Sequence, residues 1–536
     1  MKNTATGCHL SLLLLLAAWL GGCASLPPGS DFPKTPSVAF AHPEQTVVGK
    51  KFEQATQAHG GASGFRILNM GIDGFLTRAQ MINSAERSLD LQYFIFRADE
   101  TGQFLADALL RAADRGVRIR ILVDDGETAP GDEKLAALQA HPKIALRIFN
   151  PFAYRGHMEL FRFTEFLFHK SRLDYRMHNK LLVVDNALAL IGGRNIGDPY
   201  FQIDPELQLG DDDVFSVGPV VKQLSATFDD YWNSASAIPA QALEPALEKT
   251  PEQALSALRQ QLAEHRQKLQ ADGTDYVARI ASGEPLAGMI SGALPLVWAP
   301  AQVVCDSPEK SKVEKGEIVG QLMHRAVAKR VAEVQSELLI ITPYFIPGAE
   351  GMKLLQDLRQ RQVRVRVLTN SLMSTNVLAA HAGYMHYRQP LLESGVELYE
   401  IRDLLGSAKG SGQSKAMSRF GNYALHAKLF VFDRKRLFIG SMNFDQRSMH
   451  LNTEVGLIID SPELAQQIAA RFEAFAKPSN SYHLLLPAEE SGAPPGLRWR
   501  TEEGGKTVDY TEEPAQSGWR RFKANWLSLL PLDGEL

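Results

Sequence analysis

Apolar, β-favouring stretches alternate with amphipathic stretches along the chain. Residues 89–96 read LDLQYFIF, alternating at first and then continuously apolar, which predicts a strand. In residues 73–88 apolar side chains recur at helical spacing, with Phe75, Ala79 and Ile82 on one side. The elements predicted for the first half, in order, are strand 65–68, helix 73–88, strand 89–96, helix 102–115 and strand 117–123. Strands that alternate with helices predict an α/β fold with a mainly parallel or mixed sheet flanked by helices.

The second half of the chain repeats the first. Tyr93-Phe94-Ile95 recurs as Tyr344-Phe345-Ile346, and Val117-Arg118-Ile119-Arg120 recurs as Val363-Arg364-Val365-Arg366. The elements predicted there are helix 318–334, strand 338–346, helix 352–361 and strand 363–369. The two matches are displaced by 251 and 246 residues, which is nearly the same distance. We therefore interpret the halves as two copies of one domain.

The pattern divides the chain into a short leader, two domains and two connecting segments. Residues 23–60 are rich in proline and polar residues up to Lys50, so we interpret them as a tether. The first domain is expected at 61–235 and the second, with a C-terminal tail, at 298–536. Between them, 236–297 is expected to be a linker with one charged surface helix at 253–271.

Composition changes this picture little. The 536 residues are 45% hydrophobic and 22% charged, ordinary values for globular domains. The net charge of −4 provides no overall basic field, so we expect no nucleic-acid partner.

The first 22 residues are expected to be a lipoprotein signal peptide. Residues 10–20 are almost all leucine and alanine, too short for a comfortable membrane span but right for a signal peptide. Leu20-Gly21-Gly22-Cys23 resembles a bacterial lipobox, which implies cleavage before Cys23 and lipid attachment to it. Plain secretion and an uncleaved anchor are the alternatives. Cys8 would leave with the signal, so Cys305 would be the one free thiol and no intramolecular disulfide could form.

The lipobox also implies a location. The mature chain would be anchored in the cell envelope on the periplasmic side. No aspartate follows Cys23, and the sorting rule for such lipoproteins then favours the outer membrane slightly over the inner.

One motif occurs twice with the same internal spacing. Residues 177–195 read MHNKLLVVDNALALIGGRN and residues 425–443 read LHAKLFVFDRKRLFIGSMN, 248 residues apart. Each contains His-x-Lys-x-x-x-x-Asp followed by Gly-Gly/Ser-x-Asn. Side chains alternate along a strand, so the histidine and lysine of each copy share a face. Asp185 and Asp433 fall on the other parity or in the following turn, where we expect them to support the backbone or a neighbouring strand.

This paired motif resembles the phospholipase D superfamily. The resemblance implies two similar domains with one active site at their interface, and a two-step, metal-independent reaction without a cofactor. One histidine, His178 by the resemblance, attacks phosphorus and forms a phosphohistidine, while His426 handles the proton of the alcohol. Lys180, Lys428, Asn195, Ser441 and Asn443 are expected to hold the phosphate oxygens. We see no convincing set of metal ligands in the sequence.

A carboxylate is expected to orient each histidine, since a nucleophilic imidazole must present one neutral nitrogen. Glu454 occupies the position where superfamily members carry such an acid. In the first half we assign Asp213 as its counterpart, with Asp211 and Asp212 as close competitors. The first copy also departs from the family, because Gly193 stands where serine is usual and supplies no hydroxyl donor.

The substrate is expected to be a phospholipid. Residues 376–400 resemble the corresponding stretch of bacterial cardiolipin synthases. Over most of its length the chain also resembles the C type of these synthases. That implies phosphatidyl transfer from one phospholipid to phosphatidylglycerol. A hydrolytic phospholipase D, a nuclease or other phosphodiesterase, and a non-catalytic scaffold are the alternatives.

Two aromatic and basic segments are candidates for membrane contact. Residues 151–176 precede the first motif histidine and 518–536 form the tail. Such side chains are favoured at a lipid interface. The alternative is that they pack into the protein.

Overall fold

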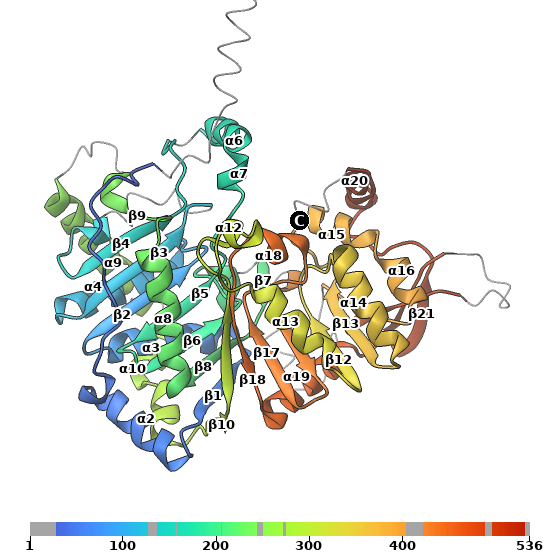
Figure 1. Cartoon of the computed structure of the whole chain (residues 1–536), viewed down its shortest axis with the longest axis horizontal. Helices are drawn as coiled ribbons and strands as arrows, with labels where there is room; N and C mark the ends of the chain where they lie inside the picture. Colours follow the sequence, from blue (N-terminus) through green and yellow to red (C-terminus); the bar gives the residue numbers. More distant parts are fainter. Residues whose placement is uncertain are drawn as a thin grey trace, which may run out of the picture.

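Two lobes lie side by side in the computed structural model, each built around one large mixed β-sheet (Figure 1). The structure describes residues 28–126, 137–156, 158–204, 206–243, 250–271, 275–403, 422–487 and 496–530. Cys23 and the signal segment lie outside these residues, so lipid attachment stays a prediction.

The sheet of the first lobe has nine strands among the described residues. Their order is β10 (Val297–Ala299), β1 (Ser63–Leu68), β8 (Asp213–Val217), β6 (Leu188–Gly192), β5 (Lys180–Val184), β2 (Ser88–Tyr93), β3 (Arg118–Asp124), β4 (Ile144–Phe149) and β9 (Ala237–Pro239). Strands β2, β3 and β4 pair in parallel, and the other neighbours in the sheet pair antiparallel.

The sheet of the second lobe has ten described strands. Their order is β11 (Ala301–Cys305), β18 (Val455–Ile459), β17 (Arg436–Gly440), β16 (Leu429–Phe432), β12 (Glu337–Ile341), β13 (Arg364–Asn370), β14 (Glu397–Ile401), β19 (Ser481–Leu485), β20 (Arg498–Glu503) and β21 (Lys506–Tyr510). Again the parallel strands are the three in the middle, β12, β13 and β14. From β1 and from β11 onward the two sheets have the same order and directions, which confirms the predicted duplication; the sheets are mixed rather than mainly parallel.

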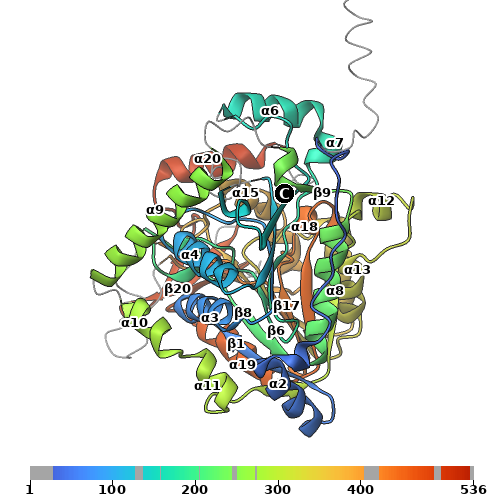
Figure 2. The same cartoon turned by 90° about the vertical axis from the view of Figure 1, so that its left-hand side faces the viewer.

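Helices cover the outer face of each sheet and also lie between the sheets (Figures 1 and 2). In the first lobe α3 (Gly71–Ser84) and α4 (Glu100–Asp114) pack outside, and in the second α13 (Met323–Ala332) and α14 (Gly348–Gln360) do so. Between the sheets lie α8 (Pro219–Asn233) and α19 (Pro462–Phe475). The remaining named α-helices are α2 (Val47–Ala58), α6 (Glu159–Phe168), α7 (Lys170–Leu173), α9 (Pro251–Ala271), α10 (Asp275–Ser282), α11 (Leu286–Ser291), α12 (Lys310–Glu314), α15 (Leu378–Met385), α16 (Arg388–Glu393), α18 (Gln446–His450) and α20 (Gly518–Ser528).

The two lobes share one hydrophobic core. Alternate residues of the motif strands, such as Leu181 and Val183 of β5 and Leu429 and Val431 of β16, are buried in the same cluster. Burying one such side chain contributes about 1.5–3 kcal/mol. The lobes are therefore held face to face by their apolar strands, and the polar residues that precede these strands meet at the same interface.

The expected tether is largely part of the first lobe. The Lys34 ammonium donates to the Ala235 carbonyl (2.9 Å), and the guanidinium of Arg120 donates to the Ser37 carbonyl (2.8 Å). Residues 47–58 then form α2, whose Phe52 is buried in the core of that lobe. The proline content led to the interpretation as a tether, but buried arginines on the lobe bind the carbonyls of this segment, and the sequence shows no sign of those contacts.

The linker also packs on the first lobe. Strand β9 joins the first sheet, and α9, the predicted charged helix, lies against α4 with Leu258 and Leu262 buried. Val297–Ala299 pairs with β1 while Ala301–Cys305 pairs with β18. The chain therefore crosses between the lobes at Pro300, two residues after the predicted boundary.

Candidate active site

Each motif histidine is fixed to the opposite lobe. The backbone amide of His178 donates to the Thr453 carbonyl (2.9 Å), and that of His426 donates to the Gly210 carbonyl (2.7 Å). Strand β15 (Asn422–Leu425), which leads into His426, pairs in parallel with β7 (Leu207–Gly210) of the first lobe. Each histidine is thus held at the lobe interface, where the family resemblance places the active site.

Glu454 of the second lobe contacts His178 of the first. Its carboxylate oxygens lie 3.0 and 3.1 Å from His178 Nδ1. This is the contact expected of a carboxylate that orients an imidazole, and it leaves Nε2 of His178 as the nitrogen that can carry a lone pair. The partner is therefore supplied across the interface rather than from the same domain.

Ser441 has a different partner from the phosphate expected for it. Its hydroxyl donates to Glu454 and accepts from the Val455 amide (3.0 Å). A hydroxyl has a single hydrogen to donate, so while this bond stands it cannot also donate to a phosphate. The structure thus corrects the interpretation of Ser441, which positions Glu454.

Asp211, rather than Asp213, contacts His426. Asp211 Oδ2 lies 2.6 Å from His426 Nδ1. The carboxylate of Asp213 instead accepts from Arg78 (2.8 and 3.0 Å) and from Arg194 (2.9 Å), all fully buried. The assignment of Asp213 is therefore wrong, and one of its two competitors occupies the position.

The sheet register explains the two-residue error. Gly192 lies opposite Asp213 in the first sheet, and Gly440 lies opposite Gly456 in the second. Asp213 therefore matches Gly456, and Asp211 matches Glu454. The spacing in the sequence could have given the correct assignment, because Asp211 and Glu454 each stand eight residues before the proline that begins the next helix.

Gly193 also has a physical reason. A Cβ atom at this position would collide with the carboxylate of Asp211. Aspartate has a shorter side chain than glutamate, so its carboxylate lies closer to the strand, in the space that the Ser441 side chain fills in the second copy. Glycine at position 193 is thus the consequence of aspartate at position 211, where the second copy has serine and glutamate.

Both motif lysines lie beside the histidines and are buried. Lys180 Nζ donates to the His178 carbonyl (2.5 Å). Lys428 Nζ donates to the His426 carbonyl and lies 3.0 Å from His426 Nδ1. Because the contact of Nδ1 with Asp211 is shorter, we assign the Nδ1 hydrogen to that bond. Two ammonium groups and two carboxylates thus surround the imidazoles.

These groups form a single electrostatic cluster. Burial, then the charges of Lys180 and Lys428, lowers the pKa of His178 well below its usual value. Burial and Lys428, with a smaller effect of Lys180, lower the pKa of His426 to about 3, against the opposing effect of Asp211. Each lysine therefore acts on both histidines. Burial lowers the pKa of Lys428 to about 8 and that of Lys180 well below its usual value.

The two carboxylates differ in protonation. Burial raises the pKa of Glu454 to about 7, although Lys180 opposes this. Burial also disfavours ionised Asp211, but Lys428 and the hydrogen bond to His426 hold the pKa of Asp211 below its usual value. Asp211 is thus ionised at neutral pH, whereas Glu454 titrates there.

The two motif aspartates bind backbone amides rather than the histidines. Asp185 accepts from the amides of Arg87 (2.8 Å) and Ser88 (2.7 Å), and Asp433 binds the equivalent segment at Ser336. Both lie in left-handed turns and anchor a neighbouring strand, as expected, so we place them among the positioning residues rather than the reacting groups.

The two asparagines are held differently. Asn195 accepts from the Ile95 amide (3.2 Å) and donates to the Tyr200 hydroxyl (2.9 Å). The buried carbonyl oxygen of Asn443 has no hydrogen-bond partner among the described residues. Phosphate binding by these asparagines stays a prediction.

Sequence reasoning missed several residues around the site. The rings of Phe94 and Tyr200 lie edge-on to His178 and His426, with centroids 5.2 and 5.3 Å apart. Beneath Glu454, the Asp306 carboxylate accepts from the Glu454 amide (3.0 Å) and pairs with buried Lys310 (3.0 Å). Phe94 belongs to the repeated Tyr-Phe-Ile segment, but that repeat does not link it to a histidine. Tyr200, Asp306 and Lys310 lie outside the repeated segments described above, so no spacing signalled them.

Comparisons with known proteins agree with this geometry. A family model described as "Cardiolipin synthase, PLD-like domain" matches residues 79–232 and 327–476. Cardiolipin synthase C of Escherichia coli (strain K12) is 35% identical over 477 residues, covering 89% of this chain and 96% of that protein. An uncharacterized protein of Helicobacter pylori (strain ATCC 700392 / 26695) is 28% identical, covering 97% and 98%.

A solved structure shares the fold. Phosphatidylserine synthase of Haemophilus influenzae Rd KW20 matches with a TM-score of 0.51 at 14% identity, covering 81% of this chain and 92% of that one. The family match covers both motif histidines and both motif lysines, and more than half of the chain. The chain therefore belongs to the family of cardiolipin synthase proteins with phospholipase D-like domains, and it carries two copies of that domain.

Proposed function

We propose that this chain is a membrane-associated phosphatidyltransferase that makes cardiolipin from phosphatidylglycerol and a second phospholipid. The observation that carries the proposal is the pair of histidine–carboxylate contacts made across the lobes, His178–Glu454 and His426–Asp211, with a buried lysine beside each. Family membership and the cardiolipin synthase relatives support the phospholipid substrate class. The side chains of the two histidines retain 11% and 7% exposure, so a substrate can reach them.

In the proposed first step, Nε2 of His178 attacks the phosphorus of the donor lipid. The P–O bond to the headgroup alcohol breaks, and His426 gives a proton to the departing oxygen. Ionised Asp211 suits His426 to this role, because a fixed carboxylate stabilises the imidazolium. The substrate phosphate, bound beside Lys180 and Lys428, offsets the two positive charges that otherwise keep the imidazoles neutral.

In the second step His426 takes the proton from a hydroxyl of phosphatidylglycerol. The resulting alkoxide attacks the phosphorus and breaks the phosphohistidine bond, so cardiolipin forms and the enzyme is restored. Water in place of this alcohol would give phosphatidic acid from the same intermediate. The reaction as proposed needs no metal ion at the phosphorus, because the lysines supply the positive charge.

Lipid products test the proposal directly. The purified protein is incubated with phosphatidylglycerol and phosphatidylethanolamine, each labelled in one acyl chain, and the products are separated. Cardiolipin carrying either label is the expected result. Phosphatidic acid without cardiolipin would make the protein a hydrolytic phospholipase D, and no lipid product from the folded protein would contradict the proposed substrate class.

The pH dependence follows from two buried groups. Below a pKa of about 7 Glu454 gains a proton and loses the negative charge that supports His178 as the nucleophile, and above a pKa of about 8 Lys428 loses its charge. We therefore expect kcat/KM, which reports the free enzyme, to rise through the first value, fall through the second and peak between them. In the Glu454→Gln variant, whatever activity remains should no longer rise with pH through the lower value. A wild-type profile that is flat across both values would contradict the assignment.

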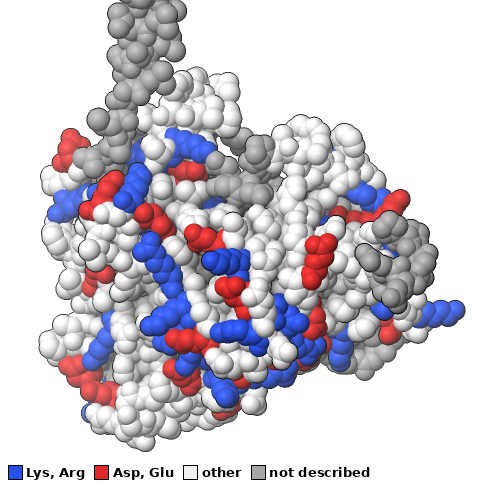
Figure 3. Space-filling model, turned by 45° about the vertical axis from the view of Figure 1, so that its right-hand side comes forward, with Lys and Arg blue, Asp and Glu red and all other residues white. Residues whose placement is uncertain are grey.

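Two helices with exposed apolar faces suggest how the protein meets its substrate. Leu160, Phe163 and Leu167 of α6, and Trp519, Phe522 and Trp526 of α20, are each more than half exposed and share one helical spacing. Both helices lie at the same end of the molecule in two perpendicular views (Figures 1 and 2), and Figure 3 shows that end mostly free of charged side chains. No helix among the described residues has both the length and the apolar character needed to cross a bilayer.

The α20 helix is fixed close to the active-site strand. Arg520 donates to the Leu372 carbonyl (2.8 Å), and Asn370 nearby binds both backbone groups of Leu425 (2.9 Å each), the residue before His426. We propose that α6 and α20 dip into the lipid interface and place the site against the bilayer.

Vesicle binding tests this surface. We expect Phe163→Ser/Leu167→Ser and Trp519→Ser/Phe522→Ser each to weaken binding to phosphatidylglycerol vesicles by at least about tenfold, since each removes two interfacial side chains. Co-sedimentation with vesicles measures this binding, and the Cys23→Ser substitution in every variant removes the lipid anchor. Val47→Ser/Val319→Ser, which changes two exposed valines on other elements, is the matched control. Unchanged binding by the correctly folded aromatic variants would rule out the surface.

The anchor adds a second membrane contact. We propose that Cys23 carries lipid and holds the protein in the cell envelope, on the periplasmic side and with the outer membrane slightly favoured. Mass spectrometry of the mature N-terminus decides whether acyl chains are present.

A further inference from the structure

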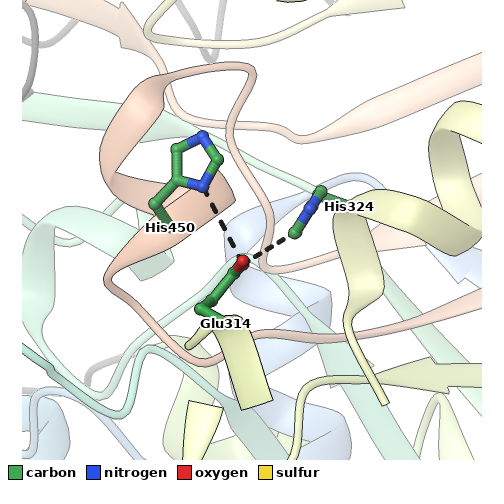
Figure 4. Close-up of side chains that lie close together, drawn as sticks. All are labelled: Glu314, His324 and His450. Atoms are coloured by element: carbon green, nitrogen blue, oxygen red, sulfur yellow. Dashed lines mark ion pairs between the residues drawn. The ribbon is translucent and has the colours of Figure 1, made fainter. Parts of the chain in front are cut away.

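Three side chains outside the reacting cluster point toward a common centre (Figure 4). Glu314 ends α12, His324 lies in the first turn of α13, and His450 ends α18. Glu314 Oε1 lies 3.5 Å from His324 Nδ1 and 3.8 Å from His450 Nδ1. No sequence pattern predicts this group, because its members are spread over more than 130 residues without a motif.

These separations differ from those of other histidine–carboxylate pairs in the described part of the chain. His426 and Asp211 lie 2.6 Å apart, His381 and Glu513 2.7 Å, and His178 and Glu454 3.0 Å. Exposed His42 and Glu44 also close to 3.1 Å. A hydrogen-bonded pair is expected at such distances, whereas two ligands about 2.0–2.1 Å from one tetrahedral ion lie roughly 3.4 Å apart. The Glu314 group therefore has the spacing of ligands rather than of hydrogen-bond partners.

The atoms that face the centre are also unsatisfied. Glu314 Oε1 and His324 Nδ1 are both shielded from solvent, and neither has a hydrogen-bond partner among the residues that the structure describes. A buried polar atom without a partner costs about 1–3 kcal/mol. Arg325 lies 4.0 Å from the other carboxylate oxygen, Oε2, and so leaves Oε1 available.

We propose that Glu314, His324 and His450 bind a zinc ion. Two imidazoles and a carboxylate are a recurrent protein ligand set for Zn²⁺, with the fourth position open to water. The side chain of His450 is 41% exposed, so water can reach that position. The ion would tie together the three helices α12, α13 and α18.

The position of the site defines its role as structural. Lys310 of α12 donates to the carbonyls of Ser448 (2.9 Å), within α18, and Asn452 (2.7 Å), just beyond it. Two residues further on is Glu454, the partner of His178. Zinc would therefore stabilise the segment that carries Glu454, without touching the phosphorus. The inference stands independently of which lipid the enzyme uses.

Metal binding to the full-length protein in detergent tests the inference. The protein is stripped with a chelator, dialysed and titrated with ZnCl₂ by calorimetry, and its metal content after equilibrium dialysis is measured by mass spectrometry. We expect one Zn²⁺ per chain and a higher melting temperature of the zinc-loaded protein, since an ion that binds only the folded state stabilises it. His324→Ala and Glu314→Gln should each weaken binding by at least roughly 100-fold, because even changes to outer-shell partners cost about 10- to 100-fold.

A matched control separates this site from adventitious binding. His42→Ala removes an exposed histidine that also has a carboxylate partner, and it should leave both the affinity and the zinc-dependent rise in melting temperature unchanged. The melting temperatures of the zinc-free proteins show whether the ligand variants fold. Absence of stoichiometric binding to the wild-type chain, or equal binding by folded His324→Ala, would overturn the site whatever the lipid products are.

Discussion

Replacing either His178 or His426 with alanine is expected to lower the rate of phosphatidyl transfer by roughly 10⁴-fold or more. Each histidine lies against a buried carboxylate from the other lobe, and neither can substitute for the other, because one bonds to phosphorus while the other moves a proton. The double variant should be little worse than either single one, since residues that act as a unit are not additive. Rates of cardiolipin formation measure this, and His59→Ala, which removes an exposed histidine stacked on Trp298, is the control.

A substrate with an activated leaving group separates the two roles. A phosphodiester that releases p-nitrophenolate needs no proton at the departing oxygen, so His426→Ala should recover part of its burst of product while His178→Ala should not. Phosphoenzyme trapped by rapid quenching into an alkaline denaturant, in which the P–N bond survives, should then appear in the His426 variant and not in the His178 variant. The opposite pattern would exchange the two histidines, and equal activity of both variants with wild type would remove the proposed mechanism.

The sequence predicted the duplicated architecture because the relevant signals are local. Alternate residues of strands β5 and β16 are buried in one shared core, and the histidine and lysine at or just before the start of each strand are two residues apart, as the strand period requires. The carboxylate partners of the histidines could not be assigned from local patterns. Glu454 and Asp211 each bind a histidine of the other lobe, so their assignment depends on how two sheets align, and a register error of two residues keeps the same side-chain parity.

Contacts between distant segments outside the paired motif left no signal in the sequence. Arg120 and Arg147 hold the residues interpreted as a tether through backbone carbonyls, which any sequence supplies. Glu314, His324 and His450 meet only because three short helices pack together. Ser441 matched its motif, yet its hydrogen-bond partner depends on where the Glu454 carboxylate lies.

The second large effect is expected from Asp211, and its neighbour Asp213 provides a matched comparison. Asp211→Asn keeps the shape of the side chain but removes the charge that accepts from His426 Nδ1 and stabilises its imidazolium. We expect kcat to fall by about 10²- to 10⁴-fold with little change in the melting temperature, by analogy with the loss of an orienting aspartate in other histidine-dependent enzymes. Steady-state transfer assays and thermal unfolding of the same preparations measure both quantities.

Asp213→Asn should give the reverse result. The Asp213 carboxylate neutralises two buried guanidiniums, those of Arg78 and Arg194, so its loss leaves uncompensated charge in the core and should cost about 3–5 kcal/mol of unfolding free energy. The fraction that still folds should keep most of its kcat, because neither arginine contacts a histidine in the observed hydrogen bonds; Arg194 reaches the site only through the backbone carbonyl of Asp211. If instead Asp213→Asn lowered kcat per folded molecule while Asp211→Asn did not, the register that pairs Asp211 with Glu454 would no longer describe the working site. The two variants therefore test the geometry and the mechanism separately, one through stability and the other through rate.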